Sequence, residues 1–132
     1  ETRDGRYLLT LDGVSRFALD AETDAATPYR IGQVDYTPFA QDLAPRPPLD
    51  GDRPHLIRLL QTWFGGEQIQ LDWTGLDAMP LEALVDRLAM LAPLPAEARQ
   101  HLLEAPDSAA RLARLESLVT TLIAGRAGGT LQ

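Results

Sequence analysis

The chain has 132 residues, a formal net charge of −7 at pH 7 and no cysteine, and its 12 strongly basic residues are all arginine. The lack of cysteine excludes disulfides, thiolate zinc sites and cysteine nucleophiles, and the lack of lysine excludes a P-loop, a Schiff base and a Ser-Lys dyad. Because no basic run offsets the negative charge, nucleic acid is not expected as a partner. No apolar run is long enough to span a bilayer, so the sequence predicts a soluble, cytoplasmic protein without a membrane partner.

The amino-terminal part of the chain predicts a β-hairpin. Residues Tyr7–Leu11 and Val14–Leu19 flank Asp12-Gly13, and these two residue types favour the positive φ angles of a type I′ turn. In this register apolar side chains fall on both faces of the hairpin. The hairpin therefore requires cover on two sides.

A third strand is predicted over Tyr29–Tyr36, with Pro28 at its entry and Pro38 at its exit. Gly32 marks a bulge or a close backbone approach within this strand. Three strands form a thin sheet with two open edges, so we expect further strands or helices to pack against it.

The composition changes between residues 43 and 52, where prolines prevent both a helix and a strand ladder. After this stretch the apolar residues recur with the period of a helix instead of that of a strand. We therefore predict an α+β protein, a partial PUA-like sheet followed by a bundle of about four helices. The predicted divisions are a β-subdomain over 1–42, a Pro-rich linker over 43–52, a helical subdomain over 53–125 and a flexible tail over 126–132.

Two helices are predicted in the first half of the helical subdomain. Asp52 caps a helix that runs through Phe64 and stops at Gly65-Gly66. A less regular piece follows around Leu71-Asp72-Trp73, and Pro80 begins the second helix. The apolar stripes of these helices comprise Leu56, Leu59, Leu60 and Trp63 in the first, and Leu81, Leu84, Val85, Leu88 and Leu91 in the second.

Two further helices are joined by a Pro-Asp corner. Pro95 suits the first turn of a short helix, which Ala105-Pro106 ends. Asp107 caps a longer helix that Gly125 ends, and the tail beyond Arg126 is expected to be mobile. The buried stripe of the longer helix comprises Leu112, Leu115, Leu118, Val119 and Leu122.

Three segments, in this order and spacing, carry a family resemblance: DGRYLLTLDGVSRF, TPYRIGQVDY and ALVDRLAMLAPLPAEARQHLLEAPDSAARLARLESLV. With the proline-rich break between the second and the third, the chain resembles the amino-terminal, substrate-binding domain of the Lon protease. In particular, it resembles the stand-alone bacterial proteins that carry this domain without the ATPase and protease segments. The resemblance covers roughly Asp4 to Leu122.

The resemblance implies a PUA-like β-subdomain, a helical bundle and a role in recognising unfolded or degron-bearing polypeptide. The chain begins where the family is already midway through its sheet, at Glu1 and without a methionine. We therefore expect that upstream residues, including the opening strands, were trimmed or left out.

Three aromatic side chains are candidates for peptide binding. Trp63 and Phe64 end the first predicted helix, and Trp73 follows shortly after them. Large aromatic side chains anchor extended apolar segments well, so a groove between this corner and the sheet could receive a peptide. The competing interpretation, which the sequence favours, is that these rings pack in the core.

The sequence indicates no catalytic centre, metal site or cofactor. Ser15, Ser108 and Ser117 lack the G-x-S-x-G context of a serine nucleophile, and His55 and His101 are interpreted as surface groups. The acidic residues at positions 20, 22 and 24 lack the glycine and terminal glutamate of a calcium loop and are interpreted as a solvated loop.

The sequence therefore predicts a non-catalytic module that binds polypeptide through apolar and strand-edge contacts. The alternative is an assembly or adaptor module that associates with itself or docks on a partner protease. A homodimer formed through an open sheet edge is a further expectation.

Overall fold

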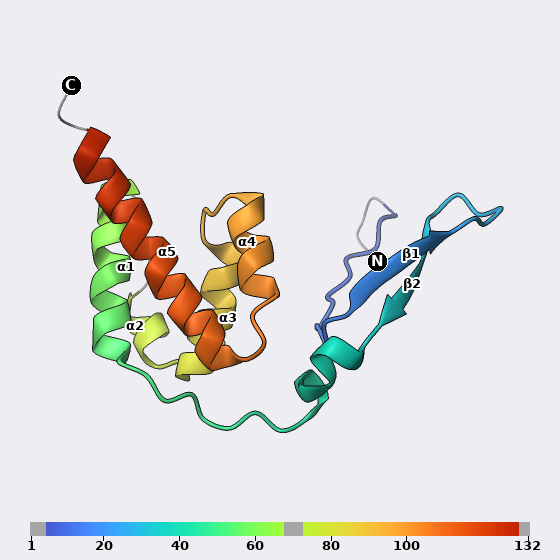
Figure 1. Ribbon diagram of the computed structural model, residues 1–132, viewed down its shortest axis with the longest axis horizontal. Helices are drawn as coiled ribbons and strands as arrows, with labels where there is room; N and C mark the ends of the chain where they lie inside the picture. Colours follow the sequence, from blue (N-terminus) through green and yellow to red (C-terminus); the bar gives the residue numbers. More distant parts are fainter. Residues whose placement is uncertain (1–4, 68–72, 130–132) are drawn as a thin grey trace. The chain divides into compact units, whose positions relative to one another are not determined.

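The structure, a computed structural model, describes residues 5–67 and 73–129 and has an α+β fold. Contacts along the chain divide it into two units, Glu1–Arg46 and Pro47–Gln132. The first unit contains the strands and the second contains the α-helices (Figure 1). The predicted α+β class is confirmed, and the two units are described in turn.

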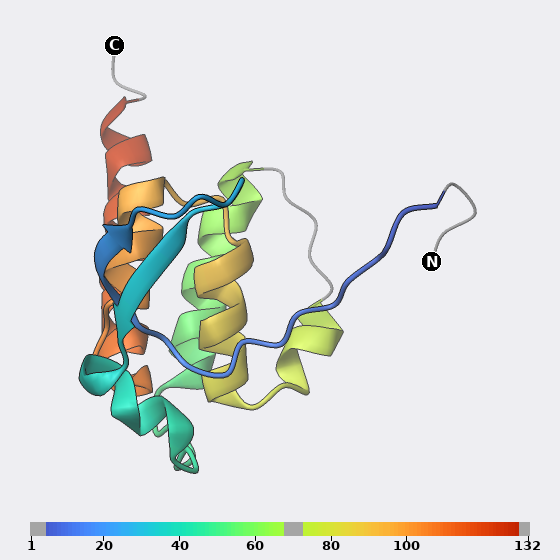
Figure 2. The same ribbon diagram turned by 90° about the vertical axis from the view of Figure 1, so that its right-hand side faces the viewer.

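The sheet of the first unit consists of two antiparallel strands, β1 (Ala18–Thr23) and β2 (Ile31–Asp35). Figure 2 shows the two strands side by side. The pairing register shifts between Leu19 and Ala21, so Asp20 has no residue opposite it. Such a bulge bends the strand and increases its local twist.

The hairpin predicted around Asp12-Gly13 is wrong. Residues 5–17 contain no strand, and β1 pairs with the predicted third strand instead. A type I′ turn needs positive φ at both central residues, but the only glycine with positive φ among those described is Gly5. The alternating residues Phe17 and Leu19 find partners elsewhere: Leu19 lies opposite Val34 on β2, and Phe17 packs on Tyr36, which follows β2.

A short 3-10 helix, η1 (Thr37–Leu43), follows β2 directly (Figure 2). Pro38 lies in its first turn, where a proline nitrogen leaves no orphan donor. The side chain of Asp35 accepts a hydrogen bond of 2.8 Å from the backbone nitrogen of Thr37. This contact fixes the corner between the strand and the helix.

The proline-rich stretch has no regular secondary structure from Pro45 to Asp52. Its second half nevertheless packs on the helical unit, because Leu49 contacts the hydrophobic core. A Cβ atom on Gly51 would lie 2.7 Å from Cδ2 of Leu112 and 3.0 Å from Cδ2 of Leu81. Glycine is therefore required here for the close approach of the backbone to two buried leucines.

The second unit is a bundle of helices, and four of them start at the predicted signals, whereas α2 falls where a less regular piece was predicted. The helices are α1 (Arg53–Glu67), α2 (Trp73–Asp77), α3 (Leu81–Leu91), α4 (Ala96–Leu103) and α5 (Ser108–Gly129). Pro80 and Pro95 occupy the N-cap positions of α3 and α4. Asp52 accepts a hydrogen bond of 2.8 Å from the nitrogen of His55, and Asp107 accepts one of 2.7 Å from Ala110. These two aspartates are the caps of α1 and α5.

One hydrophobic core holds the bundle together. Helix α5 packs against α1, α3 and α4 (Figure 1). The fully buried side chains come from each of these four helices, and each large one contributes about 1.5–3 kcal/mol on burial. The largest are Trp63, Leu56, Leu60, Leu84, Leu102, Leu115, Val85 and Val119.

Two predicted helix ends are wrong. Helix α1 continues through Gly65 to Glu67, and α5 continues through Gly125 to Gly129. A glycine inside a helix costs only about 1 kcal/mol. Helices α1 and α5 pack against each other, and helical stability in proteins comes mostly from such tertiary packing. The first four residues of the expected tail are thus helical, and Nη1 of Arg126 donates a hydrogen bond of 3.1 Å to the carbonyl oxygen of Trp63. Residues 130–132 lie outside the described residues.

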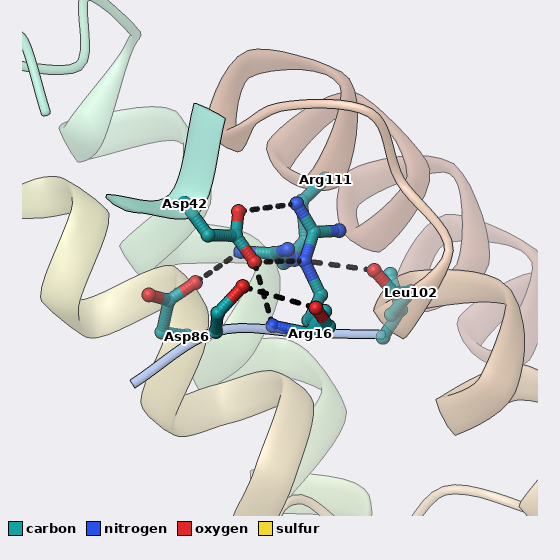
Figure 3. A network of polar contacts seen from close by, with 6 residues as sticks. Arg16, Asp42, Asp86, Leu102 and Arg111 are labelled. Atoms are coloured by element: carbon teal, nitrogen blue, oxygen red, sulfur yellow. Dashed lines mark hydrogen bonds and ion pairs between the residues drawn. The ribbon is translucent and has the colours of Figure 1, made fainter. Parts of the chain in front are cut away.

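A buried arginine joins three helices of the bundle. Arg111 on α5 forms an ion pair with Asp86 on α3, and its Nε donates a hydrogen bond of 3.1 Å to the carbonyl oxygen of Leu102 on α4 (Figure 3). Carbonyl groups in the last turn of a helix lack helical partners, so the guanidinium satisfies one of them. Arg111 itself is only 8% exposed.

We expect Gly51→Ala to lower the free energy of unfolding of the helical unit by about 1–2 kcal/mol, because the added methyl group displaces two buried leucines. Urea unfolding followed by tryptophan fluorescence measures this loss, since both tryptophans lie in the helical unit. Gly65→Ala is the matched control. Its Cβ would meet no atom within 4 Å, so it should raise stability by about 0.5–1 kcal/mol. Equal stability of Gly51→Ala and the unchanged protein would contradict this account.

We expect Arg111→Met to destabilise the helical unit by about 2–4 kcal/mol, because it leaves Asp86 without its partner and removes the donor to Leu102. The same urea experiment measures the effect. The control is Arg99→Met on the exposed side of α4, which should change stability by less than about 0.5 kcal/mol. A loss of similar size in both variants would rule out a special role for Arg111.

Candidate functional site

One face of the two-stranded sheet is apolar. The register places Leu19 opposite Val34, and the rings of Phe17 and Tyr36 pack edge to face with centroids 5.9 Å apart. Phe17, Leu19 and Tyr36 are 51%, 58% and 52% exposed. We call Phe17, Leu19, Val34 and Tyr36 the ribbon face.

The ribbon face is shaped by a glycine and ends at an ion pair. Leu19 lies over Gly32, because a Cβ atom on Gly32 would be 2.6 Å from Cδ1 of Leu19. Gly32 thus marks a close approach, as predicted, while the bulge lies on the opposite strand. Beyond Gly32, Nη1 of Arg30 pairs with Oε1 of Glu22 at 3.0 Å, and both side chains are exposed.

The opposite face of the sheet carries mostly small or polar side chains. By the same register, Ala18 pairs with Asp35, Ala21 with Gln33 and Thr23 with Ile31. Among these paired residues, Ile31 is the only large apolar one on that face. The ribbon is therefore amphipathic, with its apolar groups concentrated on the ribbon face.

No residue among the described positions 5–46 is buried. The first unit therefore lacks a hydrophobic core of its own within the described residues, and it carries most of the exposed large apolar side chains. An isolated two-stranded ribbon is only marginally stable in water, and an exposed apolar patch is typical of a binding surface. The exposed apolar residues of this unit are Tyr7, Leu8, Leu9, Leu11, Val14, Phe17, Leu19, Tyr29, Ile31, Tyr36 and Leu43.

An arginine-aspartate pair holds the first unit together in place of a core. Nε and Nη2 of Arg16 bond to the two carboxylate oxygens of Asp42 at 2.7 and 2.8 Å, and the backbone nitrogen of Arg16 adds a third bond of 3.0 Å (Figure 3). The guanidinium also lies 4.4 Å from the ring centroid of Phe39. The contact fastens η1 to the residue that precedes Phe17, and it thereby positions the aromatic end of the ribbon face.

The pair also changes the acidity of Asp42. The side-chain hydrogen bond from Arg16 lowers the pKa of Asp42 from 3.8 to about 2. The side chains of Arg16 and Asp42 are only 13% and 9% exposed, so water screens the attraction weakly. The carboxylate remains ionised at neutral pH.

Both strands have an open edge. Each strand is hydrogen-bonded to one neighbour, so the outer edges of β1 and β2 have no strand partner among the described residues. The free backbone groups of such an edge can pair with an extended segment of another chain. The site thus combines an apolar face with main-chain donors and acceptors.

The three predicted peptide-binding residues lie in the helical unit. Trp63 is 1% and Phe64 is 2% exposed, and the two rings stack with centroids 4.6 Å apart. Trp73 begins α2 and is half-buried against the same core. Their burial gives these rings a packing role, and peptide binding by them stays a prediction.

Two of the candidate reactive groups, Ser15 and Glu22, take part in local contacts. The hydroxyl of Ser15 donates a hydrogen bond of 3.0 Å to the carbonyl oxygen of Arg16. Glu22 is paired with Arg30, and residues 5–67 and 73–129 contain no cluster of metal-ligating side chains. Within the same residues, no helix combines the length and apolar character that crossing a bilayer requires.

Sequence reasoning missed the residues that organise the site. Arg16 and Asp42 are separated by 26 positions, and no local pattern connects them. The apolar alternation of Phe17 and Leu19 was visible, but its partner strand was assigned wrongly. Tyr36 was placed at the end of the third strand, next to where β2 ends.

Comparison with known proteins identifies one family. The model of the ATP-dependent protease La (LON) substrate-binding domain matches residues 1–121. No curated protein and no solved structure matches the chain. The family match confirms the resemblance that the three sequence segments indicated.

We expect the first unit to lose stability in acid because the folded-state pKa of Asp42 lies below its ordinary value. The stabilisation, about 1–2 kcal/mol, is complete above about pH 4 and disappears as the pH falls through about 2. Near-UV circular dichroism of the tyrosines measures it, since all three lie in this unit. Asp42→Asn should lower the signal at neutral pH and reduce its acid dependence, leaving the smaller contribution of Asp35, whose pKa is also lowered by hydrogen bonds from Thr37. Asp12→Asn, which alters an exposed aspartate of the same unit, should do neither.

Proposed function

Since this chain belongs to the ATP-dependent protease La (LON) substrate-binding domain family, we propose that it binds unfolded or degron-bearing polypeptide and catalyses no reaction. The observation that carries the proposal is the ribbon face, with Phe17, Leu19 and Tyr36 each about half exposed. A substrate-binding module needs such a surface, because apolar burial supplies affinity without requiring one particular sequence.

The open strand edges support the same function. An extended polypeptide that pairs with β1 or β2 gains main-chain hydrogen bonds, which do not depend on its side chains. Its alternate side chains would then lie on the ribbon face. Binding of this kind is broad, as recognition of unfolded chains requires. A cytoplasmic location stays a prediction from the sequence.

The alternative is an assembly or adaptor module, including a homodimer formed through an open sheet edge. Self-association would use the same open edges of β1 and β2 as polypeptide binding. The two functions are therefore distinguished by measurement. Two copies would each carry a formal charge of −7, and this like charge opposes their association at low ionic strength. A molar mass that rises with protein concentration would favour the alternative.

We expect the protein to bind a permanently unfolded chain, such as reduced lysozyme whose cysteines carry neutral carbamidomethyl groups, with amide signals shifting between Phe17 and Tyr36. Leu19→Ser should weaken this binding about 5- to 20-fold, because it removes the central apolar side chain of the ribbon face. Nuclear magnetic resonance titration of the labelled protein measures both effects.

Leu91→Ser is the matched control for this experiment. Leu91 lies at the end of α3 and is 72% exposed, so its loss removes a similar amount of exposed apolar surface from the helical unit. Binding should be unchanged. The proposal fails if no unfolded chain binds, or if the two serine variants weaken binding equally.

A further inference from the structure

The ribbon carries an excess of negative charge beside its apolar face. Residues 17–36 contain four acidic groups, at positions 20, 22, 24 and 35, and one basic group, Arg30, which gives a formal charge of −3 for this segment. Arg30 is already paired with Glu22. The remaining carboxylates are therefore not neutralised by a basic residue of the same segment.

The unneutralised carboxylates follow the strand that presents Leu19. Asp20 is the bulged residue of β1, and Asp24 lies one residue beyond the end of that strand. Both are exposed and have no ion-pair partner among the described residues. Asp35, at the far end of β2, accepts hydrogen bonds from Thr37 that lower its pKa, so it too is ionised at neutral pH.

We propose that the ribbon face prefers extended segments in which apolar side chains alternate with arginine or lysine. This inference rests on the proposed function and names the class of polypeptide that the same surface selects. The apolar residues of such a segment cover Phe17, Leu19 and Tyr36, and its cations lie near Asp20 and Asp24. A second copy of this chain fits the surface less well, because its own ribbon carries the same excess of negative charge.

The apolar contacts and the charge attraction have separable effects on binding. Burial of apolar side chains supplies most of the affinity and depends weakly on salt. Attraction between exposed charges gives selectivity and faster association, and salt screens it over a distance of about 10 Å at 0.1 M. Charge selectivity should therefore disappear at high salt while binding itself persists.

The test uses four fluorescently labelled peptides of equal length and fluorescence anisotropy. Three share the same leucine and phenylalanine residues and alternate them with lysine, glutamate or serine, and the fourth alternates lysine with serine. At about 25 mM salt the lysine-apolar peptide should bind about 5- to 20-fold more tightly than the glutamate-apolar peptide, with the serine-apolar peptide between them. At about 500 mM salt the three apolar peptides should agree within about twofold.

Two double variants assign the selectivity to the ribbon. Asp20→Asn with Asp24→Asn should reduce the preference for lysine over glutamate to about twofold and leave binding of the serine-apolar peptide unchanged. Glu97→Gln with Glu116→Gln removes the same charge from the helical unit and should leave the preference intact. Tyrosine circular dichroism confirms that the ribbon of each variant is folded.

Equal binding of the lysine-apolar and glutamate-apolar peptides at low salt would overturn this inference and leave the proposed function standing. Equal binding of the lysine-serine and lysine-apolar peptides would overturn it as well, because the apolar face would then contribute nothing. If neither the peptides nor an unfolded protein binds, the proposed function fails together with the inference.

Discussion

A ribbon of two strands has no second layer, so an apolar face on it must meet either water or a partner. In this chain Phe17, Leu19 and Tyr36 share such a face and remain about half exposed. In the helical unit, apolar side chains are instead shielded from water by the unit itself, since α1, α3, α4 and α5 bury their apolar stripes in one core. Stability is thus concentrated in the helical unit, whereas the surface suited to recognition is concentrated in the ribbon.

The ribbon keeps its form through a polar contact in place of a core. The two parallel hydrogen bonds between Arg16 and Asp42 fix both the position and the orientation of the guanidinium, and Phe39 covers it. Lysine could not replace this arrangement, because a single ammonium group cannot reach both carboxylate oxygens in the plane of the carboxylate. The first unit depends on the paired donors of a guanidinium group, and all 12 strongly basic residues of the chain are arginine.

The helical half of the fold could be predicted because its signals are local. Caps such as Asp52 and Asp107 act within one turn, and leucines spaced by three and four positions lie on one side of a helix. Helix ends were less predictable, since packing carried α1 and α5 past Gly65 and Gly125. The sheet was less predictable, because β1 pairs with β2 across residues 24–30 and the two-residue turn signal at Asp12-Gly13 is not used. The order of three sequence segments was enough to indicate the family. The residues of the ribbon face could be identified only from the strand register.

The proline-rich stretch has a practical consequence for digestion of the protein by trypsin. Trypsin cleaves after lysine and arginine but poorly where proline follows, and both Arg46 and Arg53 precede proline. The next arginines on either side are Arg30 and Arg58, and the chain contains no lysine. A tryptic digest should therefore retain β2, η1 and the start of α1 on a single fragment, residues 31–58. Separation of the two units by proteolysis needs an enzyme that cuts beside aspartate or leucine.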